Sequence, residues 1–384
     1  MRYAISDMRM IIGIDARFFG PRAKGLGRYT QKLIENLEKI DGKNVYIVFL
    51  REKDFESYFP QNKNFKKVLA DFPCYGFFEQ IFFPFLIGRH GIDLMHFPHF
   101  NAPIFYRKKF VVTIHDLILR HFPPKKAGVL EGLKYFIKDL AYRAVIRRAI
   151  KKSGRVVAVS EFVKKDILAH YKITPKKIRV IYEGSPDFQD SDKQKESNVA
   201  ARNSFILYVG NAYPHKNLDV LIDGFLLYLD NSGDKITKLV LAGENDYFYE
   251  RLKRQKSGPI SKYPDRIVFS GFIEENNLPA LYQKASAYVF PSLCEGFGLP
   301  PLEAMACGAP VISSDETALP EILGDAALYF NPRDPEDLAQ KIKIILEDKN
   351  LRDKLINKGY DQAKSYTWKK MAEEIKELYF ETVL

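Results

Sequence analysis

One segment, residues 287–308, places a buried strand, a glycine loop and a short helix in immediate succession. Residues 287–290 are an uninterrupted apolar run, as expected for a strand covered on both faces. Pro300 and Pro301 suit the first turn of a helix, whose amides need no intrahelical partner, and Gly308 suits the left-handed residue that ends one. The sequence therefore predicts a helix over 301–307, in a strand, loop and helix unit typical of α/β folds.

The loop of this segment, Glu295-Gly-Phe-Gly-Leu299, has the features of an anion site. Gly296 and Gly298 let the backbone approach a ligand closely, and the free N–H groups of the helix start favour a phosphate. Glu303 is expected in the first helical turn, so it and Glu295 could each accept hydroxyl hydrogens from a polyol. The simpler alternative is that Glu303 complements the helix dipole while Glu295 is a solvated loop residue.

The alternation of strand and helix runs along the whole chain and predicts a parallel α/β fold. Apolar runs predict strands at residues 10–15, 45–50, 66–69, 94–97, 110–114, 155–159 and 178–181, and again at 205–209, 238–242, 267–270, 287–290 and 311–313. A polar linker is expected over 184–198, and its Asp190-Ser-Asp192 string is interpreted as chance. With 384 residues, two domains are expected.

Composition excludes several classes of protein. No run of about 18 apolar residues exists, so no transmembrane helix is expected. The start of the chain is too short and polar for a signal peptide. Cys74, Cys294 and Cys307 are scattered without C-x-x-C spacing, which argues against a disulfide framework and a zinc site. The sequence therefore favours a protein of the reducing cytoplasm.

The net charge of +11 is unevenly shared between the halves. Residues 1–190 hold 35 Lys and Arg against 19 Asp and Glu, a balance of +16, and residues 191–384 hold 24 against 29, a balance of −5. Such a basic half could face nucleic acid, anionic lipid headgroups or only water. Each basic cluster alone suits a solvated face, but several in one half are compatible with a side that lies on the inner face of a membrane.

Other glycine loops follow predicted strands and precede helices. Gly25 and Gly27 come before a helix predicted from Tyr29, and a second loop runs from Gly210 to Lys216 after strand 205–209. An exposed lysine is the simpler reading of Lys216, but at the end of a loop its compact cation could neutralise a diphosphate. Open α/β sheets bind ligands at the carboxyl ends of their strands, so these loops are candidate ligand sites.

Three histidines stand at or near strand ends. His115 ends strand 110–114, where it is either a satisfied polar group or a site residue. His96 and His99 resemble a metal pair, but Pro98 lies between them and no acidic partner is evident. We interpret these two as structural and expect no metal site.

Residues 72–87 are unusually aromatic. Phe82, Phe83, Leu86 and Ile87 are expected to cover one face of the sheet. An exposed portion would instead suit an apolar substrate or a membrane interface. The sequence leaves both alternatives open.

The string from Glu295 to Glu303 closely resembles the E-x7-E signature of retaining glycosyltransferases of family four, which have the GT-B fold. Val-Gly-x-x-x-Pro-x-Lys-Asn over 209–217 and Thr-Ile-His-Asp-Leu over 113–117 resemble further motifs of that family. The resemblance implies two Rossmann-like domains, 1–187 for the acceptor and 200–364 for the donor, facing each other across a cleft. A terminal helix over 365–384 would return to the first domain.

The resemblance also implies roles for single residues. Glu303 would hold the ribose of the donor, Glu295 and His115 would lie by its sugar, and Lys216 would bind its diphosphate. Asn211 stands where many members carry an arginine, which puts a second phosphate contact in doubt. The implied catalytic residues are His115, Lys216 and Glu295, and the implied donor-binding residues are Gly25, Gly27, Asn211, Lys216, Gly243, Phe272, Ile273, Glu295, Gly296, Phe297, Gly298, Leu299 and Glu303.

The implied function is retaining transfer of a sugar from GDP-mannose or a UDP-sugar to a saccharide acceptor, either lipid-linked or soluble, in polysaccharide or glycoconjugate synthesis. The nucleotide sugar is a substrate, and no cofactor is expected. Front-face attack and a covalent intermediate on Glu295 are both open. A sugar-nucleotide epimerase or hydrolase could use the same fold, whereas a nucleic-acid-binding module would explain the charge but not the loops.

Overall fold

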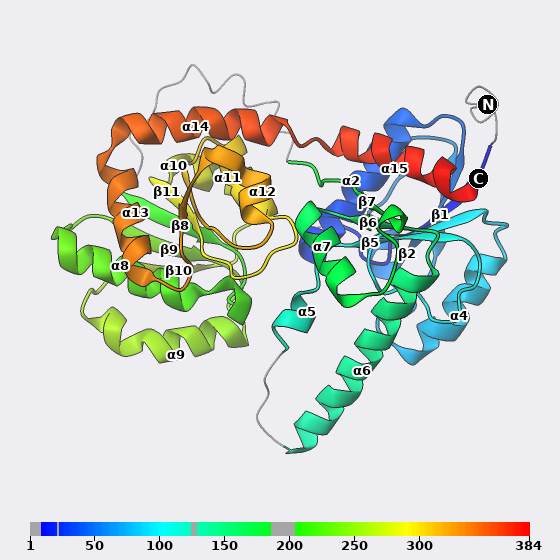
Figure 1. The fold of residues 1–384 in the computed structure, drawn as a ribbon, viewed down its shortest axis with the longest axis horizontal. Helices are drawn as coiled ribbons and strands as arrows, with labels where there is room; N and C mark the ends of the chain where they lie inside the picture. The colour runs from blue at the N-terminus through cyan, green and yellow to red at the C-terminus, as the bar shows by residue number, and fades with distance from the viewer. Residues whose placement is uncertain (1–8, 21–22, 124–128, 186–203) are drawn as a thin grey trace. The chain divides into compact units, whose positions relative to one another are not determined.

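The structure is a computed structural model that describes residues 9–20, 23–123, 129–185 and 204–384 (Figure 1). The chain forms two compact units, one of residues 1–119, 123–184 and 368–384, the other of residues 120–122 and 185–367. Most of the predicted linker, including Asp190 and Asp192, lies outside the described residues. No described helix is both long and apolar enough to cross a bilayer.

The first unit is built on a parallel sheet in the order β3-β2-β1-β4-β5-β6-β7, counted over the described residues. Its strands are β1 (Ile11–Asp15), β2 (Val45–Leu50), β3 (Phe65–Leu69), β4 (Leu94–Phe97), β5 (Phe110–Ile114), β6 (Arg155–Ala158) and β7 (Ile178–Val180). Its helices are α2 (Lys24–Ile40), α3 (Glu52–Phe55), α4 (Phe77–Gly88), α6 (Val129–Lys152), α7 (Glu161–His170) and α15 (Trp368–Val383), with a 3₁₀ turn at Pro175–Lys177. The short α5 (Ile118–His121) follows β5.

The second unit repeats this design with a sheet in the order β10-β9-β8-β11-β12-β13, again parallel throughout its described part. Its strands are β8 (Phe205–Val209), β9 (Lys238–Ala242), β10 (Ile267–Gly271), β11 (Ala287–Phe290), β12 (Val311–Ser314) and β13 (Ala327–Phe330). Its helices are α8 (Leu218–Ser232), α9 (Tyr247–Ser261), α10 (Leu278–Lys284), α11 (Leu299–Ala306), α12 (Leu319–Leu323), α13 (Pro335–Glu347) and α14 (Lys349–Lys364). Short 3₁₀ turns lie at Pro214–Lys216, Glu275–Asn277 and Gly324–Ala326.

The predicted α/β class is confirmed, and the strands explain why. The central strands β1 and β8 carry apolar side chains on both faces, and most of their residues are buried, as parallel sheets covered by helices require. Each predicted strand is present to within one residue at either end. Strand β13 was not predicted.

Helix α15 packs along α2 of the first unit. Its Tyr379 hydroxyl lies 2.6 Å from His96 Nδ1, and His96 Nε2 lies 2.9 Å from the Thr113 hydroxyl. Both ring nitrogens of this buried histidine are therefore used inside the protein. The interpretation of His96 as structural is confirmed.

The aromatic segment behaves differently from the prediction. In helix α4, Phe83 and Ile87 are buried, but Phe82 is about half exposed and does not cover the sheet. The reason is that α4 is apolar all round, while only one of its faces meets the sheet. Phe77, Phe78, Ile81 and Phe85 of this helix are likewise exposed.

Candidate active site

The chain order of the second sheet reverses between β8 and β11, the topological switch point at which open α/β sheets bind ligands. The loop after β8 carries Lys216, and the loop after β11 carries Glu295. Their side chains form an ion pair with Nζ 2.5 Å from Oε1, and both are mostly buried. The two charged residues predicted from separate motifs are thus brought together.

The position of Lys216 is fixed by its neighbours in the chain. Asn217 adopts a left-handed conformation with φ of 59°, and its side-chain amide donates to the carbonyls of Pro291 and Pro332. The Leu293 N–H donates to the His215 carbonyl at 2.7 Å. The turn that carries Lys216 is therefore bound to the loop that leads to Glu295.

Two neighbours of Lys216 add no charge at neutral pH. Burial lowers the pKa of His215 to about 4, and the nearby Lys216 charge acts in the same direction. The Asn211 side chain accepts a hydrogen bond from the Tyr213 N–H at 3.2 Å and so shapes its own loop. Lys216 therefore supplies the positive charge of this loop.

Helix α11 begins earlier than predicted, at Leu299, with Gly298 as its N-cap at φ of 101°. A Cβ on Gly298 would lie 2.7 Å from a Leu319 methyl, so both the backbone conformation and the space require glycine. Gly308 ends the helix with φ of 76°, as predicted. The earlier start places Glu303 in the second turn, so the expectation that it lies in the first turn is wrong.

Glu303 faces the interior of the unit and is nearly buried. It accepts a hydrogen bond from the Tyr282 hydroxyl at 3.2 Å. Burial and the Glu303 charge raise the pKa of the Cys307 thiol to about 12. Phe297 is buried against Tyr366, with ring centroids 5.5 Å apart. The backbone of Phe297, and not its ring, is therefore available to a ligand at this loop.

Thr317 was not predicted as a site residue. Its hydroxyl accepts a hydrogen bond from the Glu295 N–H at 3.0 Å, and its φ is 59°. A left-handed conformation is costly for a β-branched residue, and such strain is concentrated at functional sites. The sequence carries no signal for it, because Thr317 and Glu295 are 22 positions apart.

We expect Thr317→Ala to lower kcat about tenfold, the effect of losing one hydrogen bond that orients a site residue. Thr317→Ser retains the hydroxyl and should keep most of the activity. Thr317→Gly should relieve strain of about 1 kcal/mol yet remain slow, because it also lacks the hydroxyl. Turnover and urea unfolding of the three variants check this, and an alanine variant with normal turnover would exclude the role.

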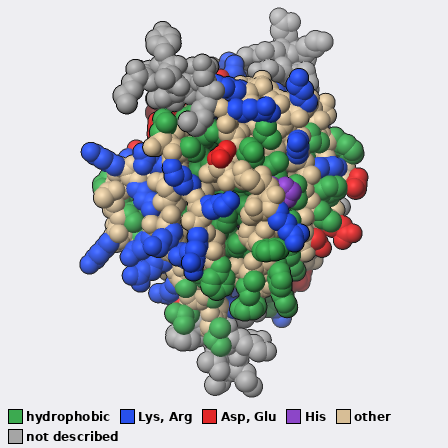
Figure 2. Space-filling view, turned by 90° about the vertical axis from the view of Figure 1, so that its right-hand side faces the viewer, with side chains coloured by type: hydrophobic (Ala, Val, Ile, Leu, Met, Phe, Trp, Pro, Cys, Tyr) green, Lys and Arg blue, Asp and Glu red, His purple; other side chains and the backbone are tan. Residues whose placement is uncertain are grey.

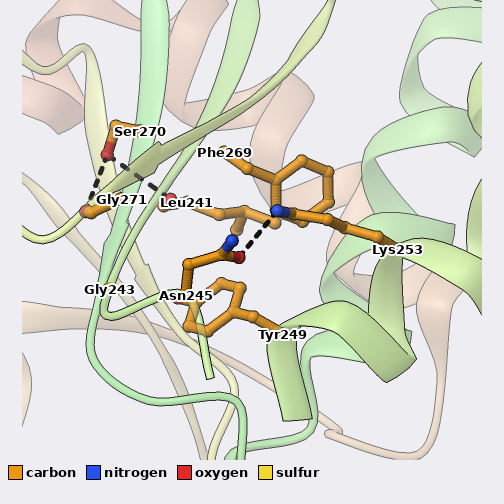
Figure 3. Close-up of a pocket in the computed structure, with 8 residues that line it drawn as sticks. All are labelled: Leu241, Gly243, Asn245, Tyr249, Lys253, Phe269, Ser270 and Gly271. Carbon is orange, nitrogen blue, oxygen red and sulfur yellow. Dashed lines mark hydrogen bonds between the residues drawn. The ribbon is translucent and has the colours of Figure 1, made fainter. Parts of the chain in front are cut away.

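A pocket lies at the carboxyl ends of β9 and β10 in the second unit (Figure 3). Within it, the Lys253 amino group lies over the Phe269 ring and donates to Asn245 Oδ1 at 2.7 Å. Gly243 forms one wall, where a Cβ would lie 2.0 Å from the Gly210 carbonyl oxygen. The lining residues are Leu241, Gly243, Asn245, Tyr249, Lys253, Phe269, Ser270 and Gly271.

The loop after β10 continues from this pocket into Phe272 and Ile273. Phe272 is one of the most exposed aromatic side chains among the described residues, and Ile273 is half-buried. A donor-binding role for these two residues and for Gly243 stays a prediction.

In the first unit, Gly25 and Gly27 lie inside the first turns of α2 and not in a loop before it. The expectation of a glycine loop ahead of this helix is therefore wrong. The helix starts five residues earlier than predicted because Lys24, at φ of 56°, turns the chain directly into it. A Cβ on Gly27 would lie 2.0 Å from the Gly20 carbonyl oxygen, so this glycine serves backbone packing. Gly25 is exposed at the helix start, where free N–H groups remain for a ligand.

His115, also in the first unit, uses both ring nitrogens within the protein. Nδ1 lies 2.8 Å from Glu183 Oε1, and Nε2 lies 2.8 Å from the Pro98 carbonyl. Burial disfavours the charged ring, but the hydrogen bond and charge of Glu183 outweigh it and raise the pKa of His115. A sugar hydroxyl could bond this ring only by replacing one of these partners. Glu183 was not predicted, although it follows β7 at the same edge of the sheet.

This pair predicts a pH-dependent stability. Because its pKa is raised on folding, His115 stabilises the protein fully below the ordinary pKa of histidine, and the contribution is lost as pH rises through the raised value. We therefore expect Glu183→Gln to reduce the free energy of unfolding by about 1–3 kcal/mol at pH 6 and by less at pH 9. Urea unfolding at both pH values measures this, with the exposed Glu381→Gln as control. An equal loss at both pH values would contradict it.

Comparison with known proteins agrees with this geometry. Residues 23–185 match the family model described as Glycosyltransferase Family 4, and residues 189–362 match the model described as Glycosyl transferases group 1. The chain belongs to glycosyltransferase family four. The two models meet where the first sheet ends and the second begins, so each unit of this family-four glycosyltransferase is accounted for.

Relatives of this glycosyltransferase include two O-antigen enzymes. The O-antigen chain mannosyltransferase RfbU of Salmonella typhimurium is 31% identical over 64% of this chain and 63% of its own length. The O-antigen chain mannosyltransferase B of Escherichia coli is 28% identical over 72% of this chain and 71% of its own. The match thus spans less than two thirds of the first of these relatives.

Among solved structures, the sucrose-phosphate synthase of Thermosynechococcus elongatus aligns with a TM-score of 0.74 at 20% identity, over 97% of this chain and 99% of that one. This likeness shows the fold of two Rossmann-like domains that the sequence predicts. It confirms the GT-B class.

Proposed function

We propose that this glycosyltransferase transfers a sugar, which we assign as mannose, from a nucleotide diphosphate donor to a saccharide acceptor in polysaccharide synthesis. The Lys216–Glu295 pair at the switch point of the second unit is the observation that carries this proposal. The mannosyltransferase relatives support the choice of sugar.

The ion pair explains how the site would respond to a donor. Glu295 neutralises Lys216 while no donor is bound, which lowers the cost of burying both charges. A donor diphosphate would compete for the ammonium group, and the carboxylate would then be released toward the sugar hydroxyls. The N–H groups of Gly298 and Leu299 at the start of α11 add partial positive charge for the same diphosphate.

We further propose that the transfer retains the anomeric configuration by front-face attack. The bond between the anomeric carbon and the phosphate oxygen breaks, and its electron pair leaves with the diphosphate. The acceptor oxygen bonds to the anomeric carbon on the same face, and its proton passes to the leaving phosphate. Lys216 and α11 would stabilise the growing negative charge in the place of a metal ion.

The acceptor in this proposal is a saccharide carried on a lipid, and the enzyme works at the inner face of a membrane. The basic balance of residues 1–190 supports this, because anionic headgroups attract such a surface. Product analysis by nuclear magnetic resonance tests the stereochemistry: a product with inverted anomeric configuration would exclude a retaining mechanism.

A thermal-shift panel of GDP-, UDP- and ADP-sugars tests the donor. We expect GDP-mannose to raise Tm the most, since a ligand that binds only the folded state stabilises it by mass action. Stabilisation by UDP-sugars alone would show that the donor carries uracil instead of guanine. No response to any nucleotide sugar would contradict the proposed function. Labelled donor incubated without acceptor separates transfer from epimerase or hydrolase activity.

A further inference from the structure

Helix α4 presents an apolar face that nothing in the described part of its unit covers. Five of its large apolar side chains are exposed, from 43% for Ile81 to 72% for Phe77. The spacing of Phe77, Ile81 and Phe85, with Phe78 and Phe82 beside them, places them in one stripe along the helix. Contiguous apolar surface of this kind marks an interaction site.

The opposite face of α4 is held firmly. Phe83 and Ile87 are buried, and the fully buried Glu79 carboxylate forms an ion pair with Arg17 at 2.7 Å. The Asn101 amide also donates to Glu79, at 3.0 Å. The exposed stripe is therefore a fixed surface and not a frayed segment that could turn inward.

Basic side chains border the stripe. The Arg89 guanidinium lies over the Phe85 ring, 4.7 Å from its centroid. The loop that contains the exposed Phe105, Arg107 and Lys108 lies against α4, since the Ile104 N–H donates to Gln80 Oε1 at 2.7 Å. Residues 94–115 contain no Asp or Glu at all. The surface of α4 and residues 105–108 is thus apolar and cationic together.

We propose that this surface, the α4 face with residues 105–108, docks on an anionic lipid bilayer. Aromatic side chains flanked by cations match the boundary between acyl chains and charged headgroups. Figure 2 shows hydrophobic side chains beside Lys and Arg over the face that it views, with few acidic ones.

The docking surface has a consequence for the acceptor, which rests on the proposed function. Arg17 follows β1 and Asn101 follows β4, and these strands flank the switch point of the first sheet. Glu79, in the first turn of α4, binds both residues. Docking through α4 would therefore hold the ligand-binding edge of this sheet close to the bilayer, where a lipid-linked saccharide resides.

The test is co-sedimentation of the full chain with vesicles of phosphatidylcholine, with and without phosphatidylglycerol. We expect binding to the anionic vesicles and weak binding to phosphatidylcholine alone. Phe78→Ser with Phe85→Ser should weaken the partition about thirtyfold through lost apolar burial. Arg107→Ser with Lys108→Ser should also weaken it about thirtyfold, at about 1 kcal/mol for each charge.

The matched control is Ile236→Ser with Tyr247→Ser, which removes two equally exposed apolar side chains from the second unit. It should bind anionic vesicles like the unaltered protein. Absence of binding, or equal loss in the control and the α4 variant, would overturn the proposal. Self-association that the Phe78 and Phe85 substitutions abolish, without vesicle binding, would assign the surface to a second copy instead. Because no donor or acceptor is present, failure here leaves the proposed transfer standing.

Discussion

Lys216→Ala is expected to lower kcat by about a hundred- to a thousandfold, the usual effect of removing one group that stabilises charge in a transition state. The substitution removes the ammonium group that lies 2.5 Å from Glu295 and leaves that carboxylate buried without its cation. Since the His215 ring is uncharged at neutral pH, it cannot replace the lost charge. Steady-state kinetics with the donor identified by thermal shift measures the effect.

Two matched variants separate this role from general damage. Lys216→Arg keeps the charge but not the compact ammonium group and should recover part of the activity. The exposed Lys235→Ala removes a lysine from the same unit and should leave kcat unchanged. Full turnover in the Lys216→Ala protein would remove Lys216 from the mechanism.

Glu303→Ala is expected to raise the donor KM by about thirty- to a hundredfold, with kcat changed only a few-fold. A carboxylate bound to ribose hydroxyls would contribute to ground state and transition state alike, and charged hydrogen bonds of this kind are worth about 2–3 kcal/mol. The variant should also lose about 1–3 kcal/mol of stability, because the buried Tyr282 hydroxyl then lacks its acceptor.

Glu303→Gln distinguishes the two effects, since the amide oxygen can still accept from Tyr282. Its stability should be close to that of the unaltered protein, while its donor KM remains raised. If the donor KM is unchanged in both variants, Glu303 has a structural role only.

The sequence allowed most strands and the switch-point loops to be predicted, for a physical reason. Strands buried on both faces are continuous apolar runs, and their loops carry glycines wherever backbone must approach closely. Helix starts were less predictable: Gly25 and Gly27 proved to be helical, because a left-handed residue such as Lys24 leaves no clear pattern.

Contacts between residues far apart in the chain could not be predicted from the sequence. Lys216 and Glu295 are 79 positions apart, and only the resemblance indicated that both serve one ligand. The support that Thr317 gives to Glu295, and that Glu183 gives to His115, depends on loops that meet at the carboxyl edges of the sheets. The sequence likewise left the exposure of α4 undecided, because a helix that is apolar on all sides does not indicate which of its faces is buried.

The central claim is that Lys216 and the start of α11 bind a donor diphosphate. A crystal structure of the protein with the nucleotide diphosphate that stabilises it most tests this directly. We expect phosphate oxygens within hydrogen-bonding distance of Lys216 Nζ and of the amides at Gly298 and Leu299, with the contact between Lys216 and Glu295 broken or lengthened. A diphosphate bound elsewhere, or an ion pair left intact beside it, would contradict it.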